Sequence, residues 1–191
     1  MTHHENLKIL AFVGLTGSGK TTAVEHFTKK GFPKVYFGGV IYKAMAEAGI
    51  ERTADSERIF REKYREEHGK DVVANKIVEQ IRELAAAGQH RVIADGIYTW
   101  SEYKVMKHAF PGELNVVAIV SPRRTRYHRL ANRVERSYTE TEAYERDQSE
   151  IENLEKGGPI AIADHYIIND DSEDALYEKL ESLASELEFT N

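Results

Sequence analysis

The sequence has no cysteine, only four prolines, and no apolar segment long enough to cross a bilayer. The lack of cysteine excludes disulfides, thiolate metal sites and a cysteine nucleophile, and it fits a reducing compartment. Residues 1–5 read Met-Thr-His-His-Glu and lack the features of a signal peptide. We therefore expect a cytoplasmic protein with no membrane partner.

Basic residues are fewer than acidic ones: the chain has 26 lysines and arginines and 32 aspartates and glutamates, so its formal net charge is −6. This balance argues against a general partner of long nucleic acids, although a local basic patch can still bind a small anionic ligand. With 41% hydrophobic and 30% charged residues, the composition is that of an ordinary globular protein. The length predicts a single domain over residues 1–191, and it does not predict an oligomeric state.

A glycine-rich loop follows an apolar run near the start of the chain. Residues 14–21 read Gly-Leu-Thr-Gly-Ser-Gly-Lys-Thr, which is the pattern G-x-x-x-x-G-K-[ST] between a predicted strand and a predicted helix. The glycines let successive backbone N–H groups point into one concavity that fits phosphate oxygens, and the dipole of the following helix favours the same anion. We expect Lys20 to reach the β- and γ-phosphates of ATP and the Thr21 hydroxyl to complete the shell of a phosphate-bound magnesium ion. The predicted nucleotide-binding residues are Gly14, Thr16, Gly17, Ser18, Gly19, Lys20, Thr21 and Thr22.

Apolar strand-like runs alternate with helix-like periodicity along the rest of the chain. The expected strands are residues 8–13, 34–37, 91–94, 114–120 and 166–168. This alternation predicts an α/β fold with three layers, in which a doubly wound parallel sheet of about five strands lies between helices. Right-handed crossovers would then place the phosphate loop, residues 38–39, Asp95, Ser121 and Asn169 along one edge of the sheet.

Asp95 ends the predicted strand at residues 91–94 and precedes a glycine. A carboxylate at this place is suited to hold magnesium, directly or through water, or to accept a proton from an attacking hydroxyl. The alternative is an aspartate that caps a turn. With Thr21, Asp95 is the candidate metal ligand.

An arginine-rich segment at about residues 122–156 is a candidate helical lid. Arginines 126, 129, 133 and 136 are three or four positions apart, which would put them on one face of a helix from Pro122 to about Arg136. Facing the phosphates, guanidinium groups would neutralise the charge that spreads over a transferred phosphoryl group. The alternative is a solvated face paired with glutamates, and Arg146 is a further possible contributor. The predicted catalytic residues are Lys20, Asp95, Arg126, Arg129 and Arg133.

These features together resemble the small phosphate-loop kinases. The resemblance is based on residues 14–21, the strand ending at Gly38, the Asp95-Gly96 turn, the arginine segment and residues 163–169, Ala-Asp-His-Tyr-Ile-Ile-Asn. The chain is similar to adenylate-kinase-related proteins of the uncharacterised archaeal-type nucleotide kinase group and, next, to dephospho-coenzyme A kinases. The resemblance implies ATP, magnesium, a lid helix and a small-molecule phosphate acceptor.

The acceptor residues depart from the pattern of nucleoside monophosphate kinases. The second strand of that family is typically followed by Gly-Asp-Leu-Leu-Arg, where this chain has Gly-Gly-Val-Ile-Tyr at residues 38–42. The family's Asp-Gly-Phe-Pro-Arg turn corresponds here to Asp-Gly-Ile-Tyr at residues 95–98. Gly38, Tyr42 and Tyr98 are therefore the candidate acceptor residues, with tyrosines at or next to the positions where the family has arginines that bind an acceptor phosphate. Tyr98, with Trp100 and Tyr103, either stacks on an acceptor or packs a helix.

The resemblance implies an ATP-dependent kinase that acts on a nucleotide-like small molecule. Dephospho-coenzyme A and a nucleoside remain alternative acceptors. A protein of another class, a nucleotide-dependent switch or regulatory ATPase, would need no acceptor at all.

Overall fold

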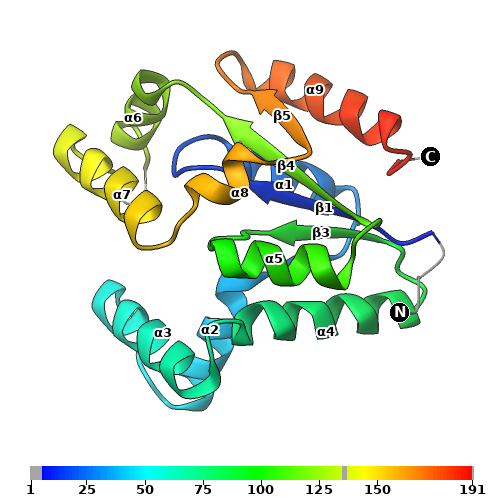
Figure 1. Cartoon of the computed structure of the whole chain (residues 1–191). Coiled ribbons are helices and arrows are strands. Elements are labelled where there is room, and N and C mark those ends of the chain that lie inside the picture. Colours follow the sequence, from blue (N-terminus) through cyan, green and yellow to red (C-terminus); the bar gives the residue numbers. More distant parts are fainter. Residues whose placement is uncertain (1–5, 135–136, 191) are drawn as a thin grey trace.

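A five-stranded parallel sheet forms the centre of the molecule (Figure 1). The computed structural model describes residues 6–134 and 137–190. The strand order is β2-β3-β1-β4-β5, so the phosphate-loop strand β1 is central. The strands are β1 Lys8–Val13, β2 Lys34–Tyr36, β3 Arg91–Asp95, β4 Leu114–Val120 and β5 His165–Ile168. The predicted α/β fold with a doubly wound parallel sheet is confirmed.

Helices cover both faces of the sheet (Figure 1). One face packs against α2, α4 and α5, and the other packs against α1 and α9. Among the residues that the structure describes, no helix has the length and apolar character needed to span a membrane. The helices are α1 Lys20–Lys29, α2 Phe37–Glu47, α3 Ala54–His68, α4 Val72–Ala86, α5 Trp100–Ala109, α6 Arg123–Ala131, α7 Glu140–Glu152, α8 Gly157–Ala161 and α9 Glu173–Glu186.

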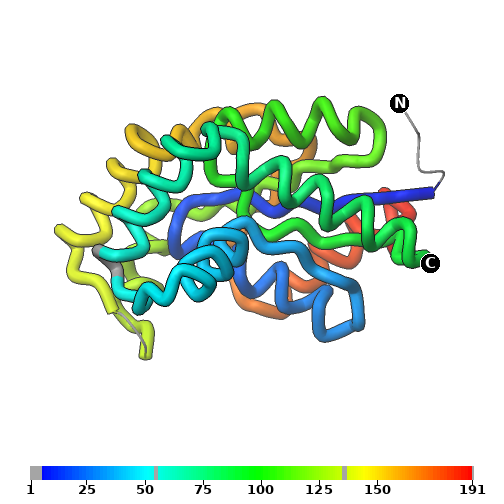
Figure 2. The backbone as a smooth tube through the Cα atoms, turned by 90° about the horizontal axis from the view of Figure 1, so that it is seen from below, coloured from blue at the N-terminus to red at the C-terminus, as the bar shows by residue number. Residues whose placement is uncertain are grey.

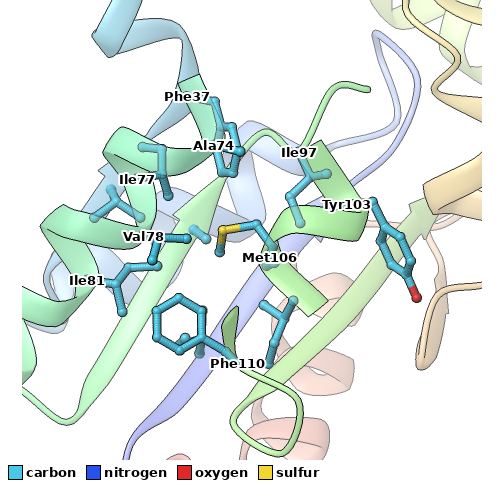
Figure 3. Close-up of a cluster of buried hydrophobic side chains, with 14 of the residues drawn as sticks. Phe37, Ala74, Ile77, Val78, Ile81, Ile97, Tyr103, Met106 and Phe110 are labelled. Atoms are coloured by element: carbon cyan, nitrogen blue, oxygen red, sulfur yellow. The ribbon is translucent and has the colours of Figure 1, made fainter. Parts of the chain in front are cut away.

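Alternation of side chains along β1 explains why the sheet is covered twice. Ile9 and Ala11 belong to the cluster beneath α2, α4 and α5, whereas Leu10 and Phe12 belong to the cluster beneath α1 and α9. Successive residues of a strand point to opposite faces, so a strand that is apolar throughout must be buried on both. Figure 3 shows the larger cluster, in which the stripe of α4 meets Met106 of α5 and Phe110.

Three helical segments extend beyond the carboxyl ends of the strands. In Figure 1, α6 and α7 lie above α3 at this end of the molecule, and Figure 2 shows α3 and α7 projecting past the same edge. The loops that follow parallel strands meet at this edge, which is where doubly wound folds bind ligands. The sheet therefore positions the phosphate loop between these projecting helices.

Two predicted boundaries are wrong. Helix α2 begins at Phe37, so Gly38 lies in the first turn of a helix instead of in a loop. The Tyr36 ring lies against this turn, since a Cβ at Gly38 would be 2.5 Å from the Tyr36 hydroxyl oxygen. Helix α6 ends at Ala131, and the Asn132 side chain donates a hydrogen bond of 2.7 Å to the His128 carbonyl in the last turn.

The early end of α6 changes the arrangement of the arginines. Arg126 and Arg129 lie on the helix, but Arg133 follows it, so the predicted stripe along one helix face is not formed. Arg136 lies outside the described residues. Helix α8 was not predicted because its sequence, Gly-Gly-Pro-Ile-Ala, reads as a loop; proline is tolerated there because it lies in the first turn.

Candidate nucleotide-binding site

The phosphate loop connects β1 to α1 and forms one wall of a cavity of about 390 Å³. Glycine is required at residue 14 because a Cβ there would lie 2.5 Å from the carbonyl oxygen of Ile119 and 2.6 Å from Ser18 Oγ. Helix α1 begins at Lys20, so its N-terminus faces the cavity as predicted. The cavity is lined by Gly14, Leu15, Thr16, Gly17, Gly19, Lys20, Thr21, Thr22, Tyr98, Arg129, Arg133, Arg146, Glu150 and Lys156.

Positive charge dominates this cavity. Five of its lining side chains are cationic and one is a carboxylate, which gives a surplus of four positive charges. A concave site of this size and charge suits a ligand with several phosphate groups. Of the predicted nucleotide-binding residues, Ser18 is the one that does not line the cavity, because it is buried beneath the loop.

Lys20 of the phosphate cavity contacts Asp95, which itself lies just outside the lining of this cavity. The Lys20 Nζ donates a hydrogen bond of 3.1 Å to Asp95 Oδ1, and Lys34 Nζ lies 4.0 Å from the other carboxylate oxygen. Strand β3 places Asp95 beside the central strand, where it pairs with Phe12 in the register. Asp95 is 9% exposed, so its carboxylate is shielded from water.

The oxygen atoms of Thr21 and Asp95 fit magnesium. This ion prefers hydroxyl, carboxylate and phosphate oxygens, and it usually binds through one or two protein groups and the phosphates of its substrate. No group of three or more histidine, aspartate or glutamate side chains converges on a metal position among residues 6–134 and 137–190. The donor set therefore suits a nucleotide-bound magnesium ion rather than an ion held by the protein alone.

Arg129 is held at the phosphate loop by a network from the ends of β4 and β5. Its Nη1 donates to Ser121 Oγ and to the Asn169 carbonyl, both at 3.1 Å. Ser121 Oγ and Asn169 Nδ2 in turn donate to the Ser18 carbonyl, at 3.1 and 2.8 Å. The predicted rim residues Ser121 and Asn169 thus brace the loop and orient a cationic group over it.

Arg126 has a different role from the predicted one. It is 5% exposed, does not line the cavity, and forms a bidentate pair with Asp147 of α7 at 2.7 and 2.6 Å. Its Nη1 also donates to the Thr16 carbonyl at 3.1 Å. A guanidinium group fixed in this way braces the loop against α7, which leaves Arg129, Arg133 and Arg146 as the arginines that line the cavity.

Glu150 of α7 was not predicted to belong to the site. It is fully buried, and it accepts hydrogen bonds from the Thr16 backbone N–H at 3.0 Å and from the Thr16 hydroxyl at 2.6 Å. Lys156 and Arg146 donate to Oε1, the oxygen that also accepts the Thr16 hydroxyl, at 2.7 and 3.2 Å. A sequence signal exists, because Ala143, Asp147 and Glu150 recur at the helical period and form the buried face of α7.

Burial and charge act against each other in the Glu150–Lys156 pair. Burial disfavours the ionised carboxylate of Glu150, but the Lys156 ammonium and the Thr16 hydroxyl outweigh it and hold the pKa of Glu150 below its usual value. Burial also lowers the pKa of Lys156, and Glu150 offsets this only in part. Lys156 is therefore a buried cation of the cavity whose proton is held less tightly than that of a surface lysine.

Tyr98 is the wall between the phosphate cavity and a second, smaller cavity. Lys20 Nζ and Lys156 Nζ lie 5.9 and 4.9 Å from the centre of its ring. Burial, followed by the neighbouring Tyr36 hydroxyl and the Asp95 carboxylate, raises the pKa of Tyr98 well above its usual value. Its hydroxyl is therefore neutral at neutral pH, so it can donate a hydrogen bond but cannot act as a general base.

The second cavity brings the three candidate acceptor residues together. It has a volume of about 20 Å³, and Gly38, Tyr42 and Tyr98 all line it. Trp100 and Tyr103 instead stack on each other with ring centres 5.3 Å apart, and Trp100 packs against Gly158, so these two aromatics serve helix packing. The remaining lining residues are Phe37, Ile41, Glu57, Arg61, Arg65, Val73 and Glu102.

The fold and the site define a phosphate-loop protein with a kinase-like architecture, and comparisons with known proteins agree. A family model described as "AAA domain" matches residues 10–153, so the chain contains a phosphate-loop domain of that family. A dephospho-CoA kinase from Campylobacter jejuni has a TM-score of 0.57 and 17% sequence identity. Its match covers 95% of this chain and 97% of that kinase. A shikimate kinase from Acinetobacter baumannii in complex with shikimate has a TM-score of 0.61 and 17% sequence identity. Its match covers 95% of this chain and 94% of that kinase. These likenesses establish the fold.

Sequence relatives identify the family. A UPF0200 protein of Thermococcus gammatolerans is 33% identical over 182 residues, which cover 94% of this chain and 95% of that relative. A UPF0200 protein of Pyrococcus furiosus is 33% identical over 180 residues, with 93% and 96% covered. The chain belongs to the UPF0200 family of archaeal proteins, and the predicted resemblance to phosphate-loop proteins with the fold of small-molecule kinases is confirmed.

Proposed function

We propose that this protein is a magnesium-dependent phosphotransferase that moves the γ-phosphoryl group of ATP to a nucleotide-like small molecule. The observation that carries the proposal is the pair of cavities that share Tyr98 as a wall. A strongly cationic cavity at the phosphate loop suits ATP, and the separate cavity of about 20 Å³ across one side chain has room for one polar group of an acceptor. A nucleotide-dependent switch needs the first cavity and has no use for the second.

The side chains of the first cavity divide the work of phosphoryl transfer. Lys20, the loop amides and the guanidinium groups of Arg129 and Arg133 would neutralise charge on the migrating group. Magnesium, held at Thr21 and Asp95, would supply further neutralisation. Asp95 is also a candidate acceptor for the proton of the attacking hydroxyl, and the neutral Tyr98 hydroxyl would orient that oxygen.

The segment at residues 122–156 would exclude water from the reacting phosphate. Its contacts with Thr16 hold α6 and α7 against the phosphate loop. Exclusion of water limits wasteful hydrolysis and strengthens each electrostatic contact inside the site. Arg126 and Asp147 would support this closure from behind, because their ion pair joins α6 to α7.

The test is ADP production from magnesium-ATP, with and without nucleoside monophosphates, nucleosides and dephospho-coenzyme A, with mass spectrometry of the products. We expect one acceptor to raise the rate and to appear phosphorylated. Lys20→Ala should remove transfer while circular dichroism remains that of the wild type. Lys29→Ala, at an exposed position of the same helix, is the matched control and should be unaffected. Retained transfer in Lys20→Ala would refute the assignment, and a rate that no acceptor changes would favour the switch.

A further inference from the structure

Helix α3 presents arginines to the small cavity on the far side of Tyr98 from the phosphate loop. We infer that Arg61 and Arg65 form a subsite for an oxyanion group of the acceptor, either a phosphate or a carboxylate. This inference rests on the proposed phosphotransferase function and specifies the chemistry of its acceptor. Tyr42 stands where nucleoside monophosphate kinases have an arginine and Tyr98 stands next to the second such position, and both line this cavity, which takes its positive charge from α3 instead.

Arg65 is fixed in place by a buried carboxylate. Its Nη2 donates a hydrogen bond of 2.8 Å to Glu102 Oε1, and Glu102 is fully buried. The other carboxylate oxygen of Glu102 accepts the backbone N–H groups of Tyr98 and Thr99, at 2.9 and 3.1 Å. A guanidinium group held at one corner presents its other donors in a fixed direction, which is the geometry that oxyanion recognition requires.

One donor of Arg65 is left without a protein acceptor. Its Nε is buried and finds no hydrogen-bond partner among the residues that the structure describes. A buried donor without an acceptor is unfavourable, so such groups in folded proteins usually meet a ligand or ordered water. The adjoining cavity of about 20 Å³ has room for one oxygen-sized group.

Arg61 shares its carboxylate partner in the cavity with a second guanidinium group. Glu57 lies 3.7 Å from Arg52 and 3.9 Å from Arg61, so one carboxylate is shared by two guanidinium groups. The Tyr42 hydroxyl also donates to Glu57 at 3.2 Å, and Arg52 lies 3.5 Å above the Tyr42 ring. The charged side chains that line the cavity are Arg61, Arg65, Glu57 and Glu102, and Arg52 lies outside this lining. Because Glu57 also serves Arg52, the Arg61 guanidinium keeps donors for an oxyanion of the acceptor.

Helix α3 is placed so that it can move to admit the rest of the acceptor. It projects past the edge of the sheet (Figure 2), and it is flanked by Gly49 and Gly69, both in the left-handed region with φ of +67° and +91°. Ile59 in its middle is 55% exposed, and Phe60 and Tyr64 are only partly buried against the core. Elements with few buried apolar contacts are those that open most readily.

The test follows the Nε–H of Arg65 by ¹H–¹⁵N NMR, with the phosphate loop saturated by magnesium and a non-hydrolysable ATP analogue. The Nε–H resonance of Arg65 is identified as the one that disappears from the spectrum of Arg65→Lys, a variant that still offers a positive charge to Glu102. Methyl phosphate and sodium acetate are the two probes, and sodium chloride at matched ionic strength is the reference. We expect a saturable shift with at least one probe, and the two arms distinguish a phosphate from a carboxylate.

Variants on the same helix make the test specific. Arg61→Gln should weaken binding of the effective probe about tenfold or more, as expected for the loss of one charged hydrogen bond. Arg58→Gln, at a position that is 56% exposed and 3.8 Å from Glu62, is the matched control and should bind as the wild type does. The inference is overturned if neither probe moves the resonance beyond the chloride reference, or if Arg61→Gln binds as tightly as the wild type.

This result is independent of the test of the proposed function. ADP production and the Lys20→Ala variant decide whether the protein is a kinase. A phosphorylated product whose acceptor is neutral would leave the kinase assignment standing and overturn the oxyanion subsite. A binding oxyanion with no phosphorylated product would do the reverse.

Discussion

The buried pair of Glu150 and Lys156 gives the sharpest test of the site geometry. The side chains are 1% and 7% exposed, and Lys156 Nζ lies 2.7 Å from Glu150 Oε1. Removal of one member of a buried ion pair strands the other charge, which typically costs about 3–5 kcal/mol. We expect about 3 kcal/mol for Glu150→Gln, at the low end because the amide oxygen can still accept from Thr16.

The double variant separates the pair from its surroundings. Lys156→Met alone should also cost about 3 kcal/mol, since it leaves a buried carboxylate with only Arg146 and Thr16 as partners. The double variant removes both charges at once, so its cost should be near that of one single variant. The expected coupling energy is therefore about 2–3 kcal/mol, well above the ~0.5 kcal/mol that independent sites show.

The assay is urea denaturation at neutral pH, with free energies of unfolding obtained by linear extrapolation. Arg146→Met is the control within the same network. Its side chain is 45% exposed, so the expected loss is at most about 1 kcal/mol. Single variants that each cost under about 1 kcal/mol, or a double variant whose cost equals their sum, would refute the buried pair.

Three further predictions use the same denaturation assay. Gly96→Ala should lower the free energy of unfolding by about 1–3 kcal/mol, because residue 96 has φ of +92° and a Cβ there would lie 2.6 Å from a neighbouring tyrosine ring. Gly112→Ala, where a Cβ would meet open space, should change it by no more than about 0.5 kcal/mol. Arg126→Ala should cost about 3–5 kcal/mol by stranding a buried carboxylate, and Arg124→Ala, at the exposed position nearby, under about 0.5 kcal/mol. Because the pKa of Lys156 is lowered in the folded protein, the unfolded chain holds this proton at pH values approaching 10.5 at which the folded chain has lost it. The free energy of unfolding of the wild type should therefore rise relative to that of Lys156→Met as the pH approaches 10.5. A difference between the two proteins that does not change with pH would contradict the lowered pKa.

The sheet was predictable because its signal is local. A strand that is buried on both faces must be apolar throughout, and β1 and β4 show this in the sequence. The phosphate loop was predictable for a related reason, since its function needs backbone conformations that few residues besides glycine adopt. Asp95 was placed on the rim by the crossover rule, and it lies beside Lys20 as that placement implies.

The lid contacts were not predictable because they depend on tertiary packing. Nothing local distinguishes Arg126, which is buried against Asp147, from Arg129, which lines the cavity three residues later. The end of α6 depends on an asparagine side chain that returns to the last turn, and this end removes Arg133 from the helix. Lys156 precedes a Gly-Gly-Pro sequence that reads as a surface loop, yet burial against Glu150 makes it part of the cavity.

Thr16 joins the phosphate loop to α6 and α7. Its backbone N–H and its hydroxyl donate to Glu150, and its carbonyl accepts from Arg126, so every polar group of this residue is bound to the segment at residues 122–156. A loop amide that already serves a carboxylate is not free for a phosphate, so Thr16 contributes by anchoring the lid rather than by binding the nucleotide. Helix α7 is thus fixed to the phosphate loop through Thr16. Helix α3 lies across the site from α7, with one face on the small cavity and its flanking glycines in left-handed conformations. On the proposed function, an acceptor that enters beside α3 would not have to break the contacts that hold α7 to the loop.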